Sequence, residues 1–389
     1  MQRIEFSAPL ANAQNYPPAL IKVEPQQPFF SLALFAASNL KQLGLQFFRS
    51  GRGALYFAAE QLKKPGDNVI LLPAYHCPAL VEPFIAAGYQ LAFYPLRADL
   101  TVDLTELKNL ITAKTTHCLL VRYFGNEAQV SSQLAWLSAQ GLVTFDDCAH
   151  DLQSFLQPEL VADASICSVK KFIASSDGGA LRLKSGAKAK LKRLPLRLEL
   201  KNLLKTLLLG LQHQNAKQQS LLPAAAADVN SCSKESAMDT QHSAELQGGE
   251  NVGQNHEVQF RYLQNTDKQQ YCYRLTPWLF YHTRLDLVLA QRQQNCKQLM
   301  AGLSKSPLGH LLWPQLPENS APYVLPFLLN HSSGFDMIRK RGLQVFRWEE
   351  LAPTNCSVSL DYRHRLIQIP CHQDLTQSDV YQIIQLFSE

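Results

Sequence analysis

The alternation of apolar and helix-like segments between residues 51 and 181 is the feature that most constrains the fold of this chain. The intervals with helical spacing end in turn signals such as Pro65-Gly66 and Gly88. This alternation predicts an α/β domain around a largely parallel sheet. Such sheets bind ligands beyond the carboxyl ends of their strands, so the polar residues after each strand are the candidates for function. The segments predicted as strands are 68–75, 90–96, 117–125, 142–148 and 164–169, and those predicted as helices are 51–62, 79–88, 104–111 and 131–140.

We divide the 389 residues into four parts: an N-terminal arm (1–30), a large domain (31–211), a low-complexity insertion (212–258) and a smaller C-terminal α/β domain (259–389). The insertion is rich in Gln, Ser, Ala and Asn, and it cannot bury enough apolar surface to offset its ordering entropy, so we expect it to be mobile. In the C-terminal part the pattern predicts one long helix over 277–299. Strands are predicted there at 323–329 and 366–370, and helices at 334–342 and 377–387.

Composition and charge exclude several classes of protein. A net charge of +5 is small for this length and indicates no nucleic-acid partner. Nine scattered cysteines without a C-x-x-C pair indicate reduced thiols in an intracellular protein and argue against a zinc site. The order of the N-terminal residues is wrong for a signal peptide, and the apolar runs are too short or too interrupted to span a bilayer. These observations predict a cytoplasmic enzyme.

Three polar clusters follow predicted strands. SGRGAL (50–55) opens a helix with small residues, which suits an anion site, although most such glycine pairs are plain turns. FDDCAH (145–150) offers two acids and a histidine that could hold a metal, bind a cation or cap a helix. ICSVKKFIASSDGGAL (166–181) carries Lys170 and Lys171. A lysine becomes a nucleophile when burial or a neighbouring cation lowers its pKa, although a solvated surface pair would have the same sequence.

Taken together, an anion cradle, a strand-end carboxylate and a lysine in this order are what pyridoxal 5′-phosphate requires of a protein. The chain resembles the DegT/DnrJ/EryC1/StrS sugar aminotransferases, which are fold-type-I pyridoxal phosphate enzymes. The resemblance runs from about Phe47 to the C-terminus. It is carried by SGRGAL, PGDNVILLPAYHCPA, RYFGNEA, FDDCAHDL, ADASICSVKKFIASSDGGAL, QRQQN and LIQIPCHQDLT.

The resemblance implies roles for particular residues. In this family the Schiff-base lysine lies seven residues before the first glycine of the GG pair, which is Lys171 and not Lys170. The second acid of the E-D-x-A-H/Q motif binds the pyridine nitrogen, which implies Asp147, while Asp146 takes the place of the usual glutamate. His150 is implied beside the phenolic oxygen of the cofactor, with a satisfied core histidine as the alternative.

The resemblance also implies a phosphate cradle and a stacking residue. The backbone amides of Arg52 and Gly53 and the hydroxyl of Ser168 correspond to the cradle, with Arg52 replacing the commoner threonine. We expect His76 to stack on the cofactor, with Tyr75 and Cys77 as alternatives at the same turn. Three further residues could either reach the site or only pack the core: Tyr123, His372 and Gln373.

The implied activity is transamination from an amino acid, with glutamate as the expected donor, to a keto sugar attached to a nucleotide, in polysaccharide or glycoconjugate biosynthesis. Fold-type-I enzymes complete their sites across a dimer interface, so a homodimer is expected. Two alternatives stay open: a sugar dehydratase, although such relatives carry histidine in place of the lysine, and a catalytically degenerate member with a binding or regulatory role.

The stretch 182–205 is basic and carries leucines at roughly helical spacing. Basic amphipathic helices can rest on anionic membranes. A solvated surface helix, broken at Pro195, is the commoner outcome of such a pattern and is the one we expect here.

Overall fold

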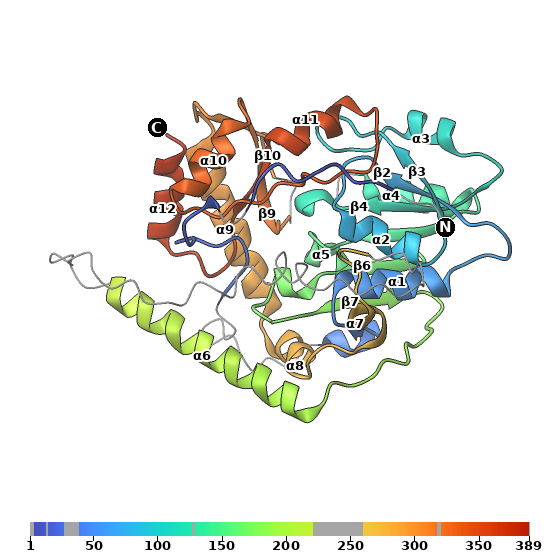
Figure 1. Cartoon of the computed structure of the whole chain (residues 1–389), viewed down its shortest axis with the longest axis horizontal. Helices are drawn as coiled ribbons and strands as arrows, with labels where there is room; N and C mark the ends of the chain where they lie inside the picture. Colours follow the sequence, from blue (N-terminus) through green and yellow to red (C-terminus); the bar gives the residue numbers. More distant parts are fainter. Residues whose placement is uncertain are drawn as a thin grey trace, which may run out of the picture.

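The computed structural model describes residues 4–12, 15–26, 39–126, 129–220, 260–316 and 320–388, with the backbone alone for 209–220. Figure 1 shows two parts, each built on its own sheet. The larger part contains the helices and strands up to β7 together with α7, and the smaller part is formed by the C-terminal segments coloured orange and red.

The larger sheet of the described residues has seven strands in the order β1-β7-β6-β5-β4-β2-β3. Neighbouring strands among β2 to β6 are parallel, and β7 is antiparallel to both β6 and β1. The predicted α/β domain around a largely parallel sheet is therefore confirmed. Because β1 runs in the same direction as β6, the carboxyl ends of β1, β2, β4, β5 and β6 meet at one edge. The strands are β1 (Gln46–Phe48), β2 (Val69–Pro73), β3 (Gln90–Tyr94), β4 (Thr115–Val121), β5 (Val143–Asp147), β6 (Ala164–Cys167) and β7 (Gly179–Leu183).

The helices of this part bury apolar faces against the sheet. In α1 the residues Ala54, Leu55, Ala58 and Ala59 form one buried face, as their spacing dictates. Helix α2 begins at a proline, which suits the first helical position because its missing N–H would have no partner there. The helices are α1 (Gly51–Gln61), α2 (Pro78–Ala86), α3 (Leu104–Leu110), α4 (Val130–Ala139), α5 (Leu152–Phe155) and α7 (Asn265–Gln269), and the 3₁₀ turns are η3 (Asn39–Leu43), η4 (Tyr123–Gly125) and η5 (Val169–Lys171).

The long helix predicted over 277–299 is in fact two helices, α8 (Leu275–His282) and α9 (Leu285–Leu303). The break lies at Thr283, whose backbone is extended and whose Oγ1 donates to the carbonyl of Leu279 at 2.7 Å. Asp286 in the first turn of α9 favours a new helix start after the break. The prediction of one helix was therefore wrong at this position.

The smaller part packs helices on an antiparallel sheet of order β10-β9-β8. The central strand β9 is buried on both faces, and α9 packs against α12 and β8. A second apolar core, separate from that of the large sheet, includes Leu299, Phe327 and Ile369. The elements are β8 (Gly309–Leu311), β9 (Val324–Leu329), β10 (Leu366–Pro370), α10 (Ser333–Lys340), α11 (Ser357–Arg365) and α12 (Gln377–Leu386).

Helix α6 (Leu196–Ser220) begins directly after Pro195 and lies along the lower margin of the molecule in Figure 1. It continues to residue 220, whereas the insertion was expected to start at 212, and residues 221–258 of that predicted insertion lie outside the described residues. No helix in the described part of the chain is both long and apolar enough to cross a bilayer. All eight cysteines there are free thiols, and the same residues contain no cluster suited to a metal ion.

Candidate active site

The site lies at the edge of the large sheet where several strands end. Asp147 is the last residue of β5 and pairs in register with Ile166 on β6. Ser168 follows β6 directly, and Lys171 is the last residue of the short turn η5 that comes next. The amide of Gly178 donates to the carbonyl of Arg49 at 2.9 Å, which joins the loop after η5 to the start of α1. The three polar clusters of the sequence thus meet at one edge.

The two neighbouring lysines have different environments. Lys171 is partly buried, and its Nζ lies 4.9 Å from the centre of the Tyr323 ring. Burial lowers the pKa of Lys171, against the attraction of the charges on Cys77 and Asp147. Lys170 is at the surface, with its Nζ 3.6 Å from Oε1 of Glu24. Only Lys171 therefore has the buried setting that a reactive amine requires.

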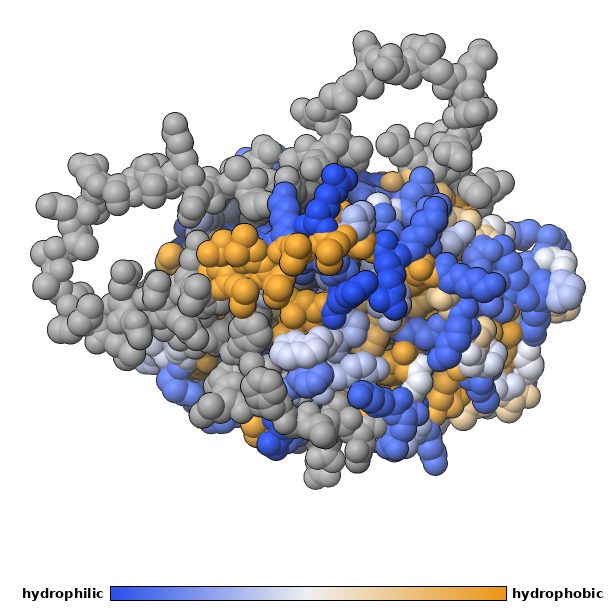
Figure 2. Space-filling view, turned by 90° about the horizontal axis from the view of Figure 1, so that it is seen from below, coloured by the Kyte–Doolittle hydropathy of each residue, from blue (hydrophilic) through white to orange (hydrophobic). Residues whose placement is uncertain are grey.

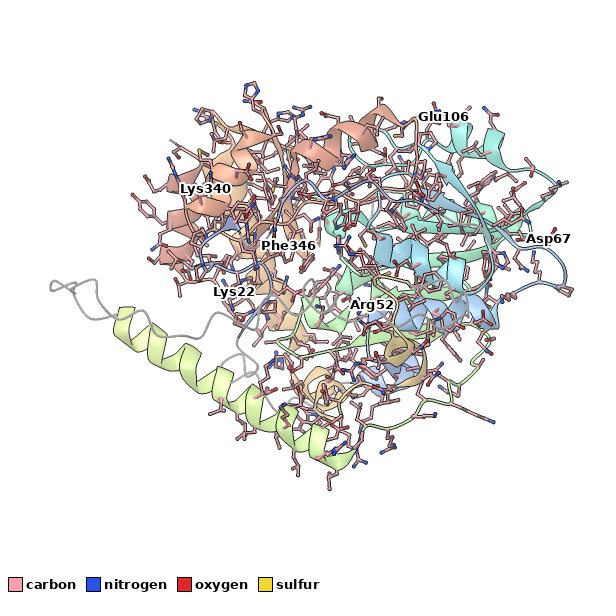
Figure 3. All side chains as sticks on the ribbon, viewed as in Figure 1. Lys22, Arg52, Asp67, Glu106, Lys340 and Phe346 are labelled. Carbon is pink, nitrogen blue, oxygen red and sulfur yellow. The ribbon has the colours of Figure 1, made fainter. Side chains whose placement is uncertain are left out.

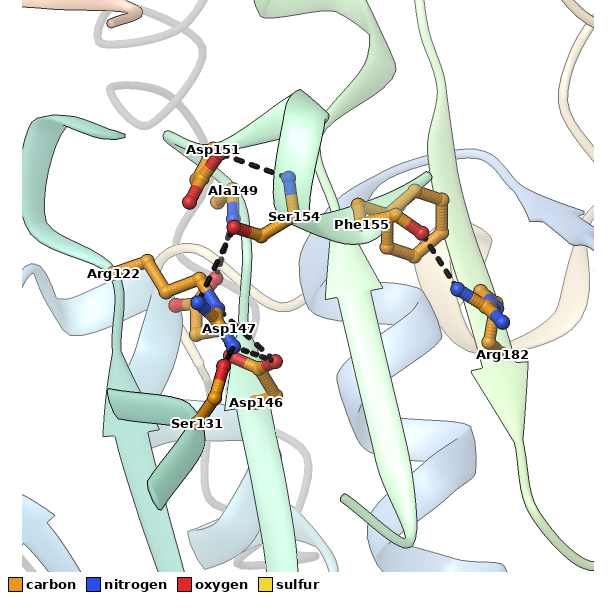
Figure 4. A network of polar contacts seen from close by, with 9 residues as sticks. All are labelled: Arg122, Ser131, Asp146, Asp147, Ala149, Asp151, Ser154, Phe155 and Arg182. Atoms are coloured by element: carbon orange, nitrogen blue, oxygen red, sulfur yellow. Dashed lines mark hydrogen bonds and ion pairs between the residues drawn. The ribbon is translucent and has the colours of Figure 1, made fainter. Parts of the chain in front are cut away.

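The two acids of FDDCAH also have different roles. Burial raises the pKa of Asp147 to about 6, against a hydrogen bond that its Oδ1 accepts from the Ala149 amide at 2.9 Å and against the charge of Lys171. Asp146 forms a buried ion pair with Arg122, with Nε and Oδ1 2.8 Å apart. Figure 4 shows this pair within a network to which Ser131 and Ser154 contribute hydroxyls. Asp147 is the carboxylate left facing the lysine.

His150 is buried among aromatic rings beside this pair. Its ring centre lies 5.1 Å from those of Phe124 and Tyr323 and 5.4 Å from that of Trp348. Burial lowers the pKa of His150 well below its usual value, and the charge of Lys171 acts in the same direction, so the imidazole is neutral. Its Nδ1 is buried without a hydrogen-bond partner, which is costly unless a ligand supplies one.

The helix start at Ser50 was expected to offer the amides of Arg52 and Gly53. The amide of Gly53 instead donates to Oγ of Ser50 at 3.2 Å, as part of the helix cap. The amides of Gly51 and Arg52 have no acceptor among the described residues and are the first two N–H groups of α1. A Cβ on Gly51 would lie 3.8 Å from Cβ of Ser168, so the serine borders these amides. The amides that could serve a phosphate are thus those of Gly51 and Arg52, because the predicted Gly53 amide is used by the helix cap.

The side chain of Arg52 is held away from this pair. Its Nε lies 2.9 Å from Oδ2 of Asp267, whose Oδ1 accepts from Oγ of Ser50 at 2.6 Å. Figure 3 shows Arg52 at the start of α1. Its guanidinium therefore ties α1 to α7, and only its backbone is available to a ligand.

The turn after β2 does not place His76 at the site. The His76 ring is fully buried and stacks on Phe93, with centres 5.4 Å apart, and its Nε2 accepts from the Ala352 amide at 3.2 Å. Burial also lowers its pKa to about 4. Cys77 is the residue of this turn that faces Lys171 and Asp147, whose charges act on its thiol. The expectation that His76 stacks on a cofactor is not supported by this placement.

Tyr75 and Tyr123 lie in the aromatic cluster behind the site. Tyr75 is fully buried, with ring centres 5.2 Å from Trp348 and 6.2 Å from Tyr123. The hydroxyl of Tyr123 donates to the carbonyl of Tyr75. Trp348 contacts both Tyr75 and His150, so Tyr75 lies behind the ring that supports His150.

Sequence reasoning missed Arg292 of α9, which joins the small part of the molecule to the lysine loop. Its buried guanidinium donates to the carbonyl of Lys171 at 2.7 Å and to that of Tyr323 at 3.1 Å, while its Nε donates to Oε1 of Gln373 at 2.9 Å. Gln373 in turn donates to the carbonyl of Phe172 at 2.8 Å. The QRQQN motif was noted only as part of a resemblance, although a buried arginine inside a helix is itself a signal.

His372 and Gln373 were expected either to approach the site or to pack the small domain. Nε2 of His372 lies 2.9 Å from the carbonyl of Lys22, so His372 holds the N-terminal arm, whose Lys22 is labelled in Figure 3. The side-chain amide of Gln373 contacts the lysine loop by donating to the main-chain carbonyl of Phe172. Gln373 therefore supports the site from behind.

The residues present fit pyridoxal 5′-phosphate. Two amides at the start of an α-helix, next to a serine, suit a phosphate. A buried carboxylate with a raised pKa gains from a protonated ring nitrogen, and a partly buried amine suits an aldehyde. The unpartnered Nδ1 of His150 offers a hydrogen bond to a phenolic oxygen. Asp147, His150, Ser168 and Lys171 are thus brought together, whereas His76 and the Gly53 amide are not.

The comparison with known proteins agrees with this arrangement. Residues 47–203 match the DegT/DnrJ/EryC1/StrS aminotransferase family. They contain the α1 start, the end of β5 and the lysine loop. No curated protein matches the chain in sequence.

Solved structures share the fold across almost the whole chain. Helicobacter pylori PseC, an aminotransferase involved in the biosynthesis of pseudoaminic acid, has a TM-score of 0.61 at 16% identity, covering 99% of this chain and 98% of its own. The putative sugar aminotransferase Spr1654 of Streptococcus pneumoniae, in its PMP form, gives 0.59 at 17%, covering 92% and 93%. The aminotransferase TlmJ of Streptoalloteichus hindustanus gives 0.58 at 14%, covering 97% and 92%. These similarities confirm the predicted fold class.

Proposed function

We propose that the chain belongs to the DegT/DnrJ/EryC1/StrS aminotransferase family, whose model matches residues 47–203, and that it is a pyridoxal 5′-phosphate-dependent aminotransferase that transfers an amino group from an amino acid to a keto sugar. The observation that carries this proposal is the meeting of Lys171 and Asp147 at one sheet edge, beside two free helix amides. Of the two lysines in the sequence pair, the one that lies over the Tyr323 ring occupies this place, while Lys170 pairs with Glu24.

When bound, the cofactor supplies an electron sink for the bond that breaks at the amino-acid Cα. Lys171 would hold its aldehyde, and Asp147 would pair with its ring nitrogen. The amides of Gly51 and Arg52 with the hydroxyl of Ser168 would hold its phosphate. His150 would donate its Nδ1–H to the phenolic oxygen, which requires the tautomer with the proton on that nitrogen.

The environment of Lys171 suits proton transfer. Burial lowers the pKa of this amine, so a larger share of it is neutral near pH 7 than for a surface lysine. Once the amino group of the substrate has replaced Lys171 on the aldehyde carbon of the cofactor, the freed neutral Nζ could accept the proton from the substrate Cα and deliver it to that former aldehyde carbon. Arg292 donates a hydrogen bond to the carbonyl of Lys171. The backbone of Lys171 is therefore held in place while its side chain moves.

Asp147 would stay ionised because of the group it binds. Its pKa of about 6 reflects burial without a cationic partner beyond Lys171. A protonated ring nitrogen at hydrogen-bond distance would lower this pKa again, and the carboxylate would in turn keep the nitrogen protonated. The two ionisations therefore support each other.

The finer assignments extend this proposal. We take glutamate as the donor, a nucleotide-linked keto sugar as the acceptor, and a homodimer as the assembly, on the basis of the family resemblance. The acceptor class agrees with the name of the Spr1654 protein, a putative sugar aminotransferase. Sedimentation of the purified chain tests the dimer.

The proposal is tested by monitoring two half-reactions spectroscopically: amino transfer from the donor to the cofactor, and amino transfer from the cofactor to the sugar. Purified protein loaded with the cofactor should change its visible absorbance when glutamate is added, and it should then aminate a member of a panel of nucleotide-linked keto sugars. The Lys171→Ala variant should do neither, while Lys170→Ala should do both. Loss of water from the sugar without amination would identify a dehydratase, and absence of any spectral change would indicate a binding protein.

A further inference from the structure

Helix α6 presents its polar side to the molecule and its apolar side to solvent. Among residues 196–208, whose side chains are described, Asn202 and Thr206 are the buried ones; they lie one turn apart and are only 6% and 5% exposed. Glu199 lies on the same side, and its Oε2 accepts the amide of Arg274 at 3.0 Å. This is the reverse of a helix that packs on a protein core, where the apolar face is the buried one.

The outward side of α6 is a stripe of leucines. Their side chains are between 37% and 67% exposed. At 100° per residue most of them fall on one face, opposite Asn202 and Thr206. Figure 2 shows the chain from below, with a continuous apolar patch on this side bordered by hydrophilic side chains. The leucines are Leu196, Leu198, Leu200, Leu203, Leu204, Leu207 and Leu208.

Basic side chains follow one edge of this stripe. Arg197, Lys201 and Lys205 recur every four residues, so they form a row beside the leucines, and all three are exposed. The segment before the helix adds further exposed cations. Between residues 184 and 208 Glu199 is the one acid, and it is held on the inward side. The further cations are Lys184, Lys188, Lys190, Lys192 and Arg193.

We propose that α6 docks the protein onto the surface of an anionic lipid bilayer. A helix with an apolar stripe and flanking cations lies in the plane of the interface, its leucines among the acyl chains and its cations at the acidic headgroups. A run of exposed leucines on one face of a helix is the kind of apolar patch that marks an interaction surface. Over its 25 residues α6 is about 37 Å long, a suitable length for such contact.

Charge decides between a bilayer and a second copy of the chain as the occupant. An antiparallel symmetric contact through this face would bring the row of Arg197, Lys201 and Lys205 close to the same row of the partner, and like charges repel at short distance. An anionic surface matches both the leucines and the cations. Figure 1 shows no labelled helix or strand beyond α6 that would block its outward face. The inference does not depend on the proposed reaction.

Sedimentation with vesicles tests the proposal. The full-length chain loaded with pyridoxal phosphate is mixed at low salt with vesicles of phosphatidylcholine alone or with added phosphatidylserine. We expect it to sediment with the phosphatidylserine vesicles only, and to be released at high salt because the charge attraction is screened.

Two variants separate the contributions of the stripe and the row. Replacing Leu200, Leu204 and Leu207 by Gln should weaken the partitioning by roughly 100-fold, because that apolar surface no longer enters the bilayer. Replacing Arg197, Lys201 and Lys205 by Gln should weaken it on the order of 100-fold as well. The control variant carries Gln in place of Leu20, Leu287 and Leu360, which are exposed leucines on other segments. This variant should bind as the unmodified chain does.

Three results would overturn the proposal. The first is a failure of the unmodified chain to sediment with anionic vesicles. The second is binding that survives loss of the three leucines. The third is a dimer that dissociates on their loss while no vesicle binding is seen, which would make a second copy the occupant. The amino-transfer rate in solution, unchanged in the helix variants, keeps this test separate from that of the enzyme.

Discussion

At the scale of single residues, the chemistry depends on how burial divides neighbouring groups of the same kind. The Nζ of Lys171 lies over the Tyr323 ring, and burial lowers its pKa, while Lys170 pairs with Glu24. Asp147 faces Lys171, while Asp146 is neutralised by Arg122. In each pair the sequence places two chemically equal candidates side by side. The fold gives only one member of each pair the environment that its proposed role needs.

The raised pKa of Asp147 leads to a prediction about the stability of the cofactor-free protein. Its pKa in the folded chain is about 6, above the ordinary value of 3.8, so the unfolded chain releases this proton first. The free energy of unfolding should therefore fall as pH rises between about 4 and 6, and stay lowered above that range. Asp147→Asn removes this cost, and it should stabilise the cofactor-free protein by about 1–3 kcal/mol above pH 6.

Urea unfolding of the cofactor-free protein and of Asp147→Asn at about pH 4 and pH 7.5 measures this effect. The variant should gain stability at the higher pH and little at the lower one. The same variant should bind the cofactor more weakly. An equal difference at both pH values would show that the carboxylate is not destabilised by burial.

At the scale of elements, the start of α1 rests on two glycines with different surroundings. A Cβ on Gly53 would lie 2.4 Å from the carbonyl oxygen of Asp267 in α7, whereas a Cβ on Gly51 would meet nothing closer than 3.8 Å. The first contact is far too short, so α7 would have to move. Glycine is therefore required at 53 by the packing of α1 on α7.

Gly53→Ala should lower the free energy of unfolding by roughly 1–3 kcal/mol, since the strain exceeds the helix-propensity gain. Gly51→Ala in the same helix is the matched control, and it should change stability by less than about 1 kcal/mol. Thermal and urea unfolding of both cofactor-free variants measure the difference. Equal stability of the two variants would refute the close packing of α1 on α7.

Most elements of the large sheet could be predicted because their signals are local. Apolar runs such as 69–73 and 143–147 and the helical spacing at 51–61 are readable within ten residues. Strands β1 and β8, each three residues long, carry too little pattern to be seen. The break at Thr283 was missed because both halves have helical spacing and neither Gly nor Pro marks the join.

The candidate site was predictable to the extent that it lies at strand ends. That rule singles out the three polar clusters, and the family resemblance then implies Asp147, Ser168 and Lys171 within them. The position of His76 could not be predicted, because a residue at a turn can point either into the core or toward the site. Its contacts with Phe93 and Ala352, which lie in distant segments, hold it in the core. The free amide of Gly51 was not predicted. The amide that was predicted, that of Gly53, is used by the Ser50 cap of α1.

At the scale of the whole molecule, Arg292 links the two parts. Its guanidinium reaches the carbonyls of Lys171 and Tyr323 and the side chain of Gln373, so the lysine loop, the residue before β9 and the segment after β10 share one buried donor. A lysine at this place keeps the charge but lacks the planar fork that serves three acceptors. The position of the Lys171 backbone therefore depends on the docking of the smaller part.

Arg292→Lys should lower kcat/KM by about 10–100-fold, because the amine is no longer held in place, and it should shift the limb of the pH profile that reports on Lys171. Arg284→Lys, an exposed arginine that pairs only with Asp286 in the described structure, is the control and should change neither. Loss of stability without any shift of the pH profile would show that Arg292 only supports the fold.

The central claim is that Lys171 is the amine that holds the cofactor. Incubating the protein with pyridoxal phosphate, reducing it with borohydride and mapping the labelled peptide by mass spectrometry tests this directly. The account predicts a single phosphopyridoxyl group on Lys171, absent in Lys171→Ala and unchanged in Lys170→Ala. A label on Lys170, or no label within 166–181, would contradict it.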